Sequence, residues 1–135
     1  MALPKKRILV VDDEASFTRL LKLNLEQTGL YEVQTENQAL EALATARAFK
    51  PDLILLDVMM PGQDGGAIAA RLRESPSLKE APIIFLTAAV KKEEVASHKG
   101  QIGGLPFLAK PVDLDDLLKH LECWLDGSAS PEPAV

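Results

Sequence analysis

Three aspartates of the sequence stand directly after short apolar runs. Asp12 and Asp13 follow the run Ile8 to Val11, and Asp57 follows the run Leu53 to Leu56. If these runs are neighbouring parallel strands, their carboxyl ends meet at one edge of the sheet and the three carboxylates gather there. Such an all-oxygen site suits Mg²⁺ or a similar hard divalent ion, because a cation offsets the repulsion between the acids.

An Asp-Asp pair alone has a simpler explanation, which is a helix N-terminus with acidic side chains in solvent. Asp57 favours the metal site, because an acid directly after a strand of four apolar residues has no packing role. The sequence therefore predicts that Asp12, Asp13 and Asp57 act together.

A hydroxyl and an ammonium group are expected at the same edge. Thr87 follows the apolar run Ile83 to Leu86, and Lys110 stands before Pro111 after a further run. A threonine at a strand end is often only a good β-former, and a lysine is usually a solvated charge. Together with the aspartates, however, they supply what a phosphorylated carboxylate needs.

The runs that carry these residues have the character of strands in a parallel sheet. Ile8 to Val11, Leu53 to Leu56 and Ile83 to Leu86 are apolar throughout, as expected of interior strands buried on both faces. Tyr31 to Thr35 alternates polar and apolar residues, and Leu105 to Leu108 contains a proline, so both are expected at sheet edges.

The segments between the strands have the i, i+3, i+4 apolar spacing of amphipathic helices. The residues expected on their apolar stripes are Phe17, Leu20, Leu21 and Leu25; Leu40 and Leu43; Ile68 and Leu72; and Leu114, Leu117, Leu118, Leu121, Trp124 and Leu125. Asp113 and Asp116 are expected to cap the first turn of the last helix. The weakest helix candidate is Lys91 to Ile102, because Gly100 lies inside it. His98 and His120 are expected to be exposed helical residues.

Five alternations of strand and helix predict a doubly wound α/β fold, with a five-stranded parallel sheet in the order 2-1-3-4-5. Five helices would cover the sheet in a three-layer α/β/α sandwich. In this order the winding reverses between the first and third strands, and ligands bind at such a point.

Composition and charge narrow the function further. The chain of 135 residues is 47% hydrophobic and 26% charged, with a formal net charge of -5, which disfavours direct nucleic-acid binding. The first apolar run is too short for a signal peptide and no stretch is long enough for membrane insertion, so we expect a cytoplasmic protein. Residues 126–135 are expected to form a disordered tail or a truncated linker.

The pattern Asp12-Asp13, Asp57, Met60-Pro61-Gly62, Thr87 and Lys110-Pro111 resembles the receiver domains of bacterial two-component response regulators. The resemblance covers residues 5–125 and is closest to single-domain, chemotaxis-type regulators. It implies the flavodoxin-like version of the fold and a phosphoprotein that takes part in phosphorelay signalling.

The resemblance also implies a role for each site residue. Asp57 would accept the phosphoryl group from a phosphohistidine and form an aspartyl phosphate, assisted by Thr87 and Lys110. Mg²⁺ would be held by Asp13 and Asp57 directly, by Asp12 through a water, and by the main-chain carbonyl of Met59. Such a domain catalyses its own phosphorylation and dephosphorylation but is not a conventional enzyme.

Further expectations concern signalling. Thr87 and Phe107 would form a switch that alters a protein-binding surface on the fourth helix, fifth strand and fifth helix. The implied partners are a sensor histidine kinase or phosphotransfer protein and a downstream effector, with the chain a monomer or a weak phosphorylation-dependent dimer.

The main alternative is a pseudo-receiver that docks proteins without phosphorylation. An aspartyl phosphatase is disfavoured by Met59 at the position of a second acid, and a nucleotide binder by the lack of a glycine-rich phosphate loop.

Overall fold

A single twisted sheet organises the chain. The computed structural model describes residues 5–57, 59–60, 63–78, 81–87, 101–102, 105–109 and 112–125. The strands of the main sheet are β1 (Lys6–Val11), β2 (Tyr31–Glu36), β3 (Leu53–Asp57), β6 (Ile83–Thr87), β7 (Gln101–Ile102) and β8 (Leu105–Ala109), in the spatial order β2-β1-β3-β6-β8-β7. The first five of these in space are parallel, which confirms the predicted order 2-1-3-4-5.

Two expectations for the far side of the sheet are wrong. Leu105 to Leu108 does not form the outermost strand, because the short strand β7 pairs with β8 in antiparallel fashion. Gln101 and Ile102, expected at the end of a helix, form this strand instead. The added strand is only two residues long, which suits an edge where Pro106 has no N–H to donate. Residues 91–100 of the expected fourth helix lie outside the described residues.

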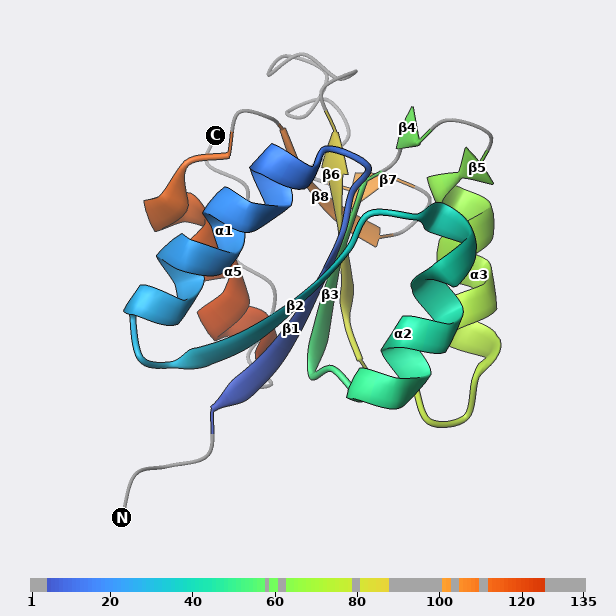
Figure 1. The fold of residues 1–135 in the computed structure, drawn as a ribbon, viewed down its shortest axis with the longest axis horizontal. Helices are drawn as coiled ribbons and strands as arrows, with labels where there is room; N and C mark the ends of the chain where they lie inside the picture. Colours follow the sequence, from blue (N-terminus) through green and yellow to red (C-terminus); the bar gives the residue numbers. More distant parts are fainter. Residues whose placement is uncertain are drawn as a thin grey trace.

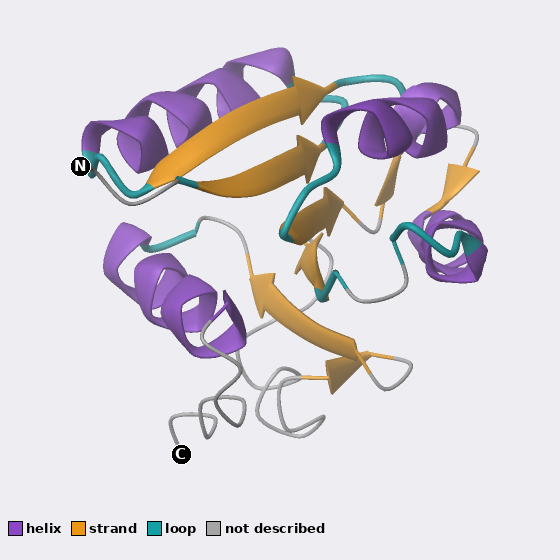
Figure 2. Cartoon of the chain, turned by 90° about the horizontal axis from the view of Figure 1, so that it is seen from below, coloured by secondary structure: helices purple, strands orange, loops and turns teal. Residues whose placement is uncertain are grey.

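Helices cover both faces of the sheet. They are α1 (Ala15–Gln27), the 3-10 turn η1 (Ala39–Glu41), α2 (Ala42–Phe49), α3 (Gly65–Glu74) and α5 (Leu114–Leu125). Figure 1 shows α1 and α5 on one face and α2 and α3 on the other, and Figure 2 shows the sheet between the two layers. A small antiparallel pair, β4 (Met59–Met60) with β5 (Gln63–Asp64), follows the carboxyl end of β3. No helix in the part of the chain that the structure describes is long and apolar enough to cross a membrane.

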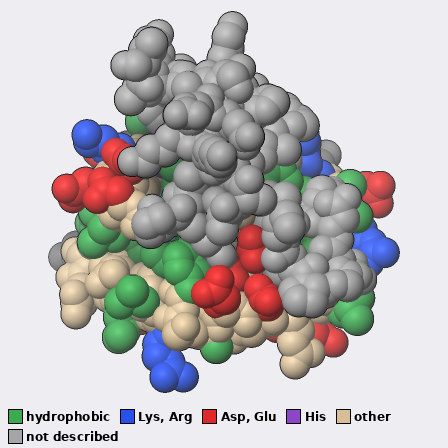
Figure 3. Space-filling model, turned by 90° about the horizontal axis from the view of Figure 1, so that it is seen from above, with side chains coloured by type: hydrophobic (Ala, Val, Ile, Leu, Met, Phe, Trp, Pro, Cys, Tyr) green, Lys and Arg blue, Asp and Glu red, His purple; other side chains and the backbone are tan. Residues whose placement is uncertain are grey.

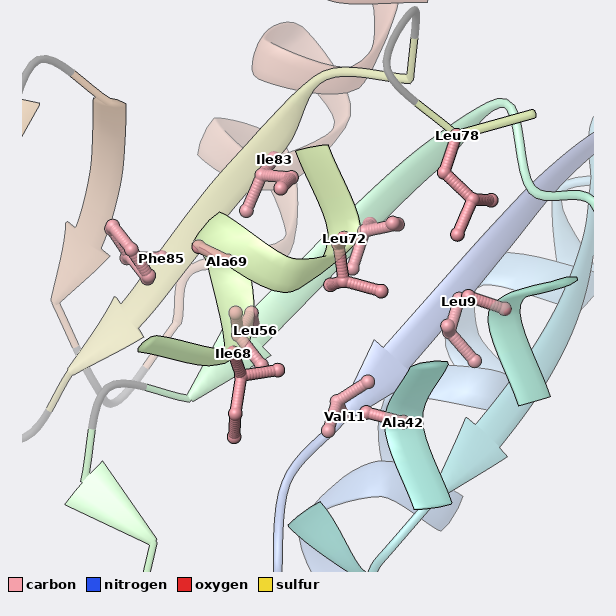
Figure 4. Packing of buried hydrophobic residues seen from close by; sticks show 12 residues of the cluster. Leu9, Val11, Ala42, Leu56, Ile68, Ala69, Leu72, Leu78, Ile83 and Phe85 are labelled. Carbon is pink, nitrogen blue, oxygen red and sulfur yellow. The ribbon is translucent and has the colours of Figure 1, made fainter. Parts of the chain in front are cut away.

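The three runs predicted to be interior strands are buried on both faces. Alternate residues of each strand enter two separate cores, because successive side chains of a strand point to opposite sides. Leu9, Val11 and Leu56 pack with α2 and α3 (Figure 4). Ile8 and Leu55 belong to the core beneath α1 and α5. Both faces of the sheet are therefore covered, and its strands are packed from two sides.

The helical stripes were predicted less accurately than the strands. Leu21 and Leu25 of α1 are buried as expected, but Leu20 is 57% exposed. Leu40 is 71% exposed because it lies in η1, before α2 begins; the small residues Ala42 and Ala46 face the core in its place. In α5 the expected stripe is confirmed, with its centre, Leu117 and Leu121, fully buried.

The start of α5 is capped as predicted. Asp113 accepts a hydrogen bond of 3.2 Å from the main-chain N–H of Asp116, which satisfies one of the free donors of the first turn. His120 departs from its expectation, because it is half-buried on this helix.

Candidate functional site

The carboxyl ends of β1 and β3 lie side by side. Val11 pairs in register with Leu56, so the next residue of each strand, Asp12 and Asp57, stand at the same level of the sheet. These strands are the ones between which the direction of winding reverses, since β2 lies beyond β1 and β6 lies beyond β3. The fold therefore places the acidic residues at the point where doubly wound sheets bind their ligands.

The three predicted aspartates come together. Carboxylate oxygens of Asp12, Asp13 and Asp57 all lie within 4.8 Å of one another. Asp12 is fully buried and Asp57 is 3% exposed, whereas Asp13 is exposed at the rim. Figure 3 looks onto this end of the sheet and shows acidic side chains gathered near its middle. The cluster thus has a buried floor and one side that faces solvent.

Mutual repulsion makes this cluster costly without a counter-charge. Two like unit charges 4 Å apart repel by about 1 kcal/mol in water and by about 4 kcal/mol at an effective dielectric constant of 20. Carboxylate oxygens are the ligands that Mg²⁺ prefers, and Mg²⁺ usually keeps several of its waters. The donor set of Asp12, Asp13 and Asp57, with its solvent-facing side, therefore fits a partly hydrated magnesium ion.

Asp12 is held in place by the groups around it. Its main-chain N–H donates to the carbonyl of Glu36 at 3.0 Å, which continues the β1/β2 pairing past the end of the strand. Its Oδ1 accepts from the N–H of Glu14 at 3.0 Å, a local bond that closes the turn into α1. Its main-chain carbonyl accepts from Nδ2 of Asn37 at 2.8 Å. Backbone and side chain of this aspartate are both positioned.

Asn37 is the residue of this region that the sequence analysis missed. It follows β2, whose carboxyl end lies at the same edge of the sheet as those of β1 and β3. Asn37, like the aspartates, is a polar residue just after a parallel strand. The pattern that identified the aspartates would therefore also have identified Asn37.

Of the other predicted site residues, Thr87, Phe107 and Met59 lie on strands. Thr87 is the last residue of β6 and is in register with Ala109, the last residue of β8. Phe107 lies in the middle of β8, opposite Phe85. Met59 begins β4, two residues after Asp57. Lys110, directly after β8, lies outside the described residues.

Sequence comparison assigns this fold and site to a family. The response regulator receiver domain family model matches residues 8–122. The chain belongs to this family. The match spans the receiver domain from β1 to α5 and includes each of the predicted site residues.

Individual relatives agree with this assignment. The chain is 45% identical over 130 residues to the alkaline phosphatase synthesis transcriptional regulatory protein PhoP of Bacillus subtilis, covering 96% of this chain and 52% of that protein. It is 34% identical to protein PilH of Pseudomonas aeruginosa, covering 90% of this chain and 98% of PilH. The chain thus spans about half of the PhoP-type relative and nearly all of PilH.

Solved structures show the same fold. Chemotaxis protein CheY4 of Vibrio cholerae superposes with a TM-score of 0.74 at 33% identity, over 88% of this chain and 98% of CheY4. The receiver domain therefore has the doubly wound, flavodoxin-like fold expected from its sequence, and relatives that include single-domain proteins of similar length.

Proposed function

We propose that this receiver domain accepts a phosphoryl group on Asp57 in a Mg²⁺-dependent reaction and thereby changes a protein-binding surface. The observation that carries the proposal is the meeting of Asp12, Asp13 and Asp57 within 4.8 Å at the carboxyl edge of the sheet. Membership of the receiver family supports it, as does the burial of Asp57 beside a solvent-facing rim.

The proposed reaction transfers a phosphoryl group from a histidine nitrogen to a carboxylate oxygen. A carboxylate oxygen of Asp57 attacks the phosphorus of a phosphohistidine in line with the P–N bond. The P–O bond forms as the P–N bond breaks, and the bonding electron pair returns to the histidine nitrogen. The product is an aspartyl phosphate, which water later hydrolyses to restore the carboxylate.

In this proposal the chain's own residues position the reactants and balance charge. Asp13 and Asp57 would hold Mg²⁺ directly, Asp12 would act through a water, and the carbonyl of Met59 would complete the protein ligands. When bound, the ion neutralises charge that builds up on the phosphoryl oxygens. Thr87 and Lys110 supply a hydroxyl and an ammonium to the same oxygens.

The proposed partners follow from this chemistry. A sensor histidine kinase or a phosphotransfer protein provides the phosphohistidine, and a downstream effector reads the modified surface. That surface comprises the expected fourth helix, β8 and α5, with Thr87 and Phe107 linking it to the phosphorylated site. The proposal includes a cytoplasmic location, a monomer or a weak phosphorylation-dependent dimer, and no direct contact with nucleic acid.

Chemical phosphorylation tests the proposal without knowledge of the kinase. The protein is incubated with acetyl phosphate and Mg²⁺, and its intact mass is followed with time. We expect one labile phosphoryl group on the wild-type chain and none on Asp57→Asn. Asp115→Asn, which removes an exposed carboxylate on α5, is the matched control and should be modified like the wild type.

Two outcomes would overturn the proposal. Modification that persists in Asp57→Asn would place the acceptor elsewhere. A wild-type chain that stays unmodified at saturating Mg²⁺ would favour the alternative of a docking module that works without phosphorylation.

A further inference from the structure

The side chain of Asn37 connects the segment Asp12 to Glu14, which follows β1, to helix α1. Its Nδ2 lies 2.8 Å from the main-chain oxygen of Asp12 and 3.0 Å from Oγ1 of Thr18. Asp12 immediately precedes the exposed ligand candidate Asp13, and Thr18 lies in the first turns of α1. One amide group therefore connects the residue before Asp13 to α1.

The chemistry of the neighbours determines which atom of the amide makes these contacts. The carbonyl of Asp12 can only accept, so the Asn37 atom facing it must be the N–H₂ group. The hydroxyl of Thr18 donates its own hydrogen to the carbonyl of Ala15 at 3.1 Å, and so accepts from Asn37. Both N–H bonds of the amide are used. A carboxylate or an apolar side chain at position 37 could not supply them.

The groups that form these bonds are shielded from solvent to different degrees. Asp12 is fully buried and Thr18 is 1% exposed, whereas Asn37 itself is half-buried. A buried polar group that loses its hydrogen bond destabilises the structure around it. Removing the Asn37 amide would break both bonds at once, one to the residue before Asp13 and one to α1.

We infer that Asn37 is a positioning residue that holds the Asp12–Glu14 turn in the geometry needed for Mg²⁺ binding beside Asp57. This inference rests on the proposed function. Residues that orient metal ligands typically change metal affinity by 10–100-fold when mutated. Asn37 touches neither phosphoryl group nor metal in this account, and acts only through Asp12 and Thr18.

A purely structural role predicts a different result, and the contrast makes the inference testable. If Asn37 only stabilised the fold, its loss would lower the free energy of unfolding equally with and without Mg²⁺. If it positions the ligands, its loss also reduces the additional stability that Mg²⁺ provides, because that increment depends on the dissociation constant of the ion.

The experiment compares Asn37→Ala with Gln38→Ala, which removes an exposed amide one position further along. Mg²⁺ affinity is measured by calorimetry, and urea unfolding is measured with and without Mg²⁺. We expect the Mg²⁺ dissociation constant to rise about tenfold in Asn37→Ala and to stay unchanged in Gln38→Ala. Phosphorylation by acetyl phosphate should need more Mg²⁺ in Asn37→Ala, while its rate at saturating Mg²⁺ stays within about twofold.

A second pair of variants keeps the test valid if Asn37→Ala does not fold. Thr18→Val preserves the shape of the side chain but removes the hydroxyl, whereas Thr18→Ser keeps the hydroxyl. We expect weaker Mg²⁺ binding in Thr18→Val and wild-type affinity in Thr18→Ser.

The outcomes separate this inference from the proposed function. A wild-type protein that binds no Mg²⁺ would overturn both. A wild-type protein that binds Mg²⁺, with the same dissociation constant in a folded Asn37→Ala, would overturn the positioning role of Asn37 alone. If Asn37→Ala does not fold, an unchanged dissociation constant in Thr18→Val would overturn it. A tenfold loss in Asn37→Ala that Gln38→Ala does not share would support it.

Discussion

Lys22 of α1 donates a hydrogen bond of 2.7 Å to the main-chain carbonyl of Val33 in β2. One turn later in the helix, Glu26 accepts a hydrogen bond of 3.2 Å from the N–H of the same valine. The two side chains also form an ion pair at 3.4 Å. An edge strand is thus bonded on its outer side by side chains from a helix.

These bonds satisfy the N–H and C=O groups of Val33, which do not pair with a neighbouring strand of the described sheet. The carbonyl of Leu30 accepts from Lys6 of β1, and that of Glu36 accepts from Asp12 directly after β1. In a parallel pair the residues that face the neighbouring strand alternate. Val33 therefore directs its N–H and C=O away from β1. Open edges of this kind can pair with another chain, and charged side chains over the edge discourage it.

Removing this cover should affect both stability and association. We expect Glu26→Ala to lower the free energy of unfolding by about 1 kcal/mol, because the N–H of Val33 loses a charged acceptor in a half-buried setting. It should also increase association at high protein concentration, measured by light scattering. Glu122→Ala, at an exposed position of α5, is the control. Equal behaviour of the two variants would show that Glu26 does not protect the edge.

Crowding of negative charge at the site predicts that Asp13→Asn changes stability in opposite directions without and with Mg²⁺. Asp13→Asn should raise the free energy of unfolding in metal-free buffer by about 1 kcal/mol, since it removes one of three close negative charges. If Mg²⁺ binds to this cluster as proposed, the same variant should lose the stabilisation that the ion gives the wild type. Urea unfolding with and without Mg²⁺ measures both effects, with Asp115→Asn as reference. A metal-free Asp13→Asn less stable than wild type would contradict the account.

Burial of His120 should make stability depend on pH. Desolvation lowers the pKa of His120 below its ordinary 6.5, and the nearby charge of Asp116 opposes this shift without reversing it. The unfolded chain therefore takes up a proton first as the pH falls below about 6.5, and the free energy of unfolding decreases until the folded pKa is passed.

A leucine at position 120 should reduce that pH dependence. Nδ1 of His120 is buried and, within the structure described, has no hydrogen-bond partner, so His120→Leu should also raise stability at neutral pH. Urea midpoints between about pH 7 and pH 5 give the comparison. His98→Gln, at the only other histidine of the sequence, controls for the change in composition. An unchanged slope in His120→Leu would refute the assignment.

The end of α2 offers a stabilising substitution. Lys50 has φ 56° and ψ 63°, the left-handed conformation, and its N–H donates to the carbonyl of Ala46 at 2.8 Å. Glycine adopts this conformation without strain, so Lys50→Gly should raise the free energy of unfolding by about 0.5–1 kcal/mol. Lys50→Ala keeps the strain and should give no gain. Thermal unfolding of both variants measures the difference.

Phe107 provides a test of signal output. We expect Phe107→Ala to retain phosphorylation on Asp57 and to weaken the phosphorylation-dependent capture of an effector from native lysate. A beryllofluoride mimic of the phosphoryl group supplies the active state for the wild type and the variant alike. Capture that does not change in Phe107→Ala would remove this residue from the switch.

The strands and their acidic ends were predictable because burial on both faces of a parallel sheet leaves a local mark. Runs such as Leu53 to Leu56 are apolar without a break, and a charged residue directly after them stands out. The alternation of strands and helices then limits the order of the sheet. For the same reason the cluster of Asp12, Asp13 and Asp57 followed from sequence and topology rules together.

The helical faces were harder to predict, because a 3.6-residue period gives a direction only when the start of the helix is known. The 3-10 turn before α2 shifts the phase, so Leu40 faces solvent while Ala42 and Ala46 enter the core. Small residues carry almost no signal of their own, yet they allow the helix to lie close to the sheet.

Sequence by itself determined the fold class, the family and the meeting of Asp12, Asp13 and Asp57, since apolar runs mark the strands and topology rules bring their acidic ends together. Tertiary structure alone decided that Asn37 bonds the carbonyl of Asp12, that Lys22 and Glu26 cover Val33, and that His120 is desolvated. These contacts join segments that are distant along the chain or depend on packing around a helix. Their geometry is fixed by how the elements pack, which no local pattern of residues records.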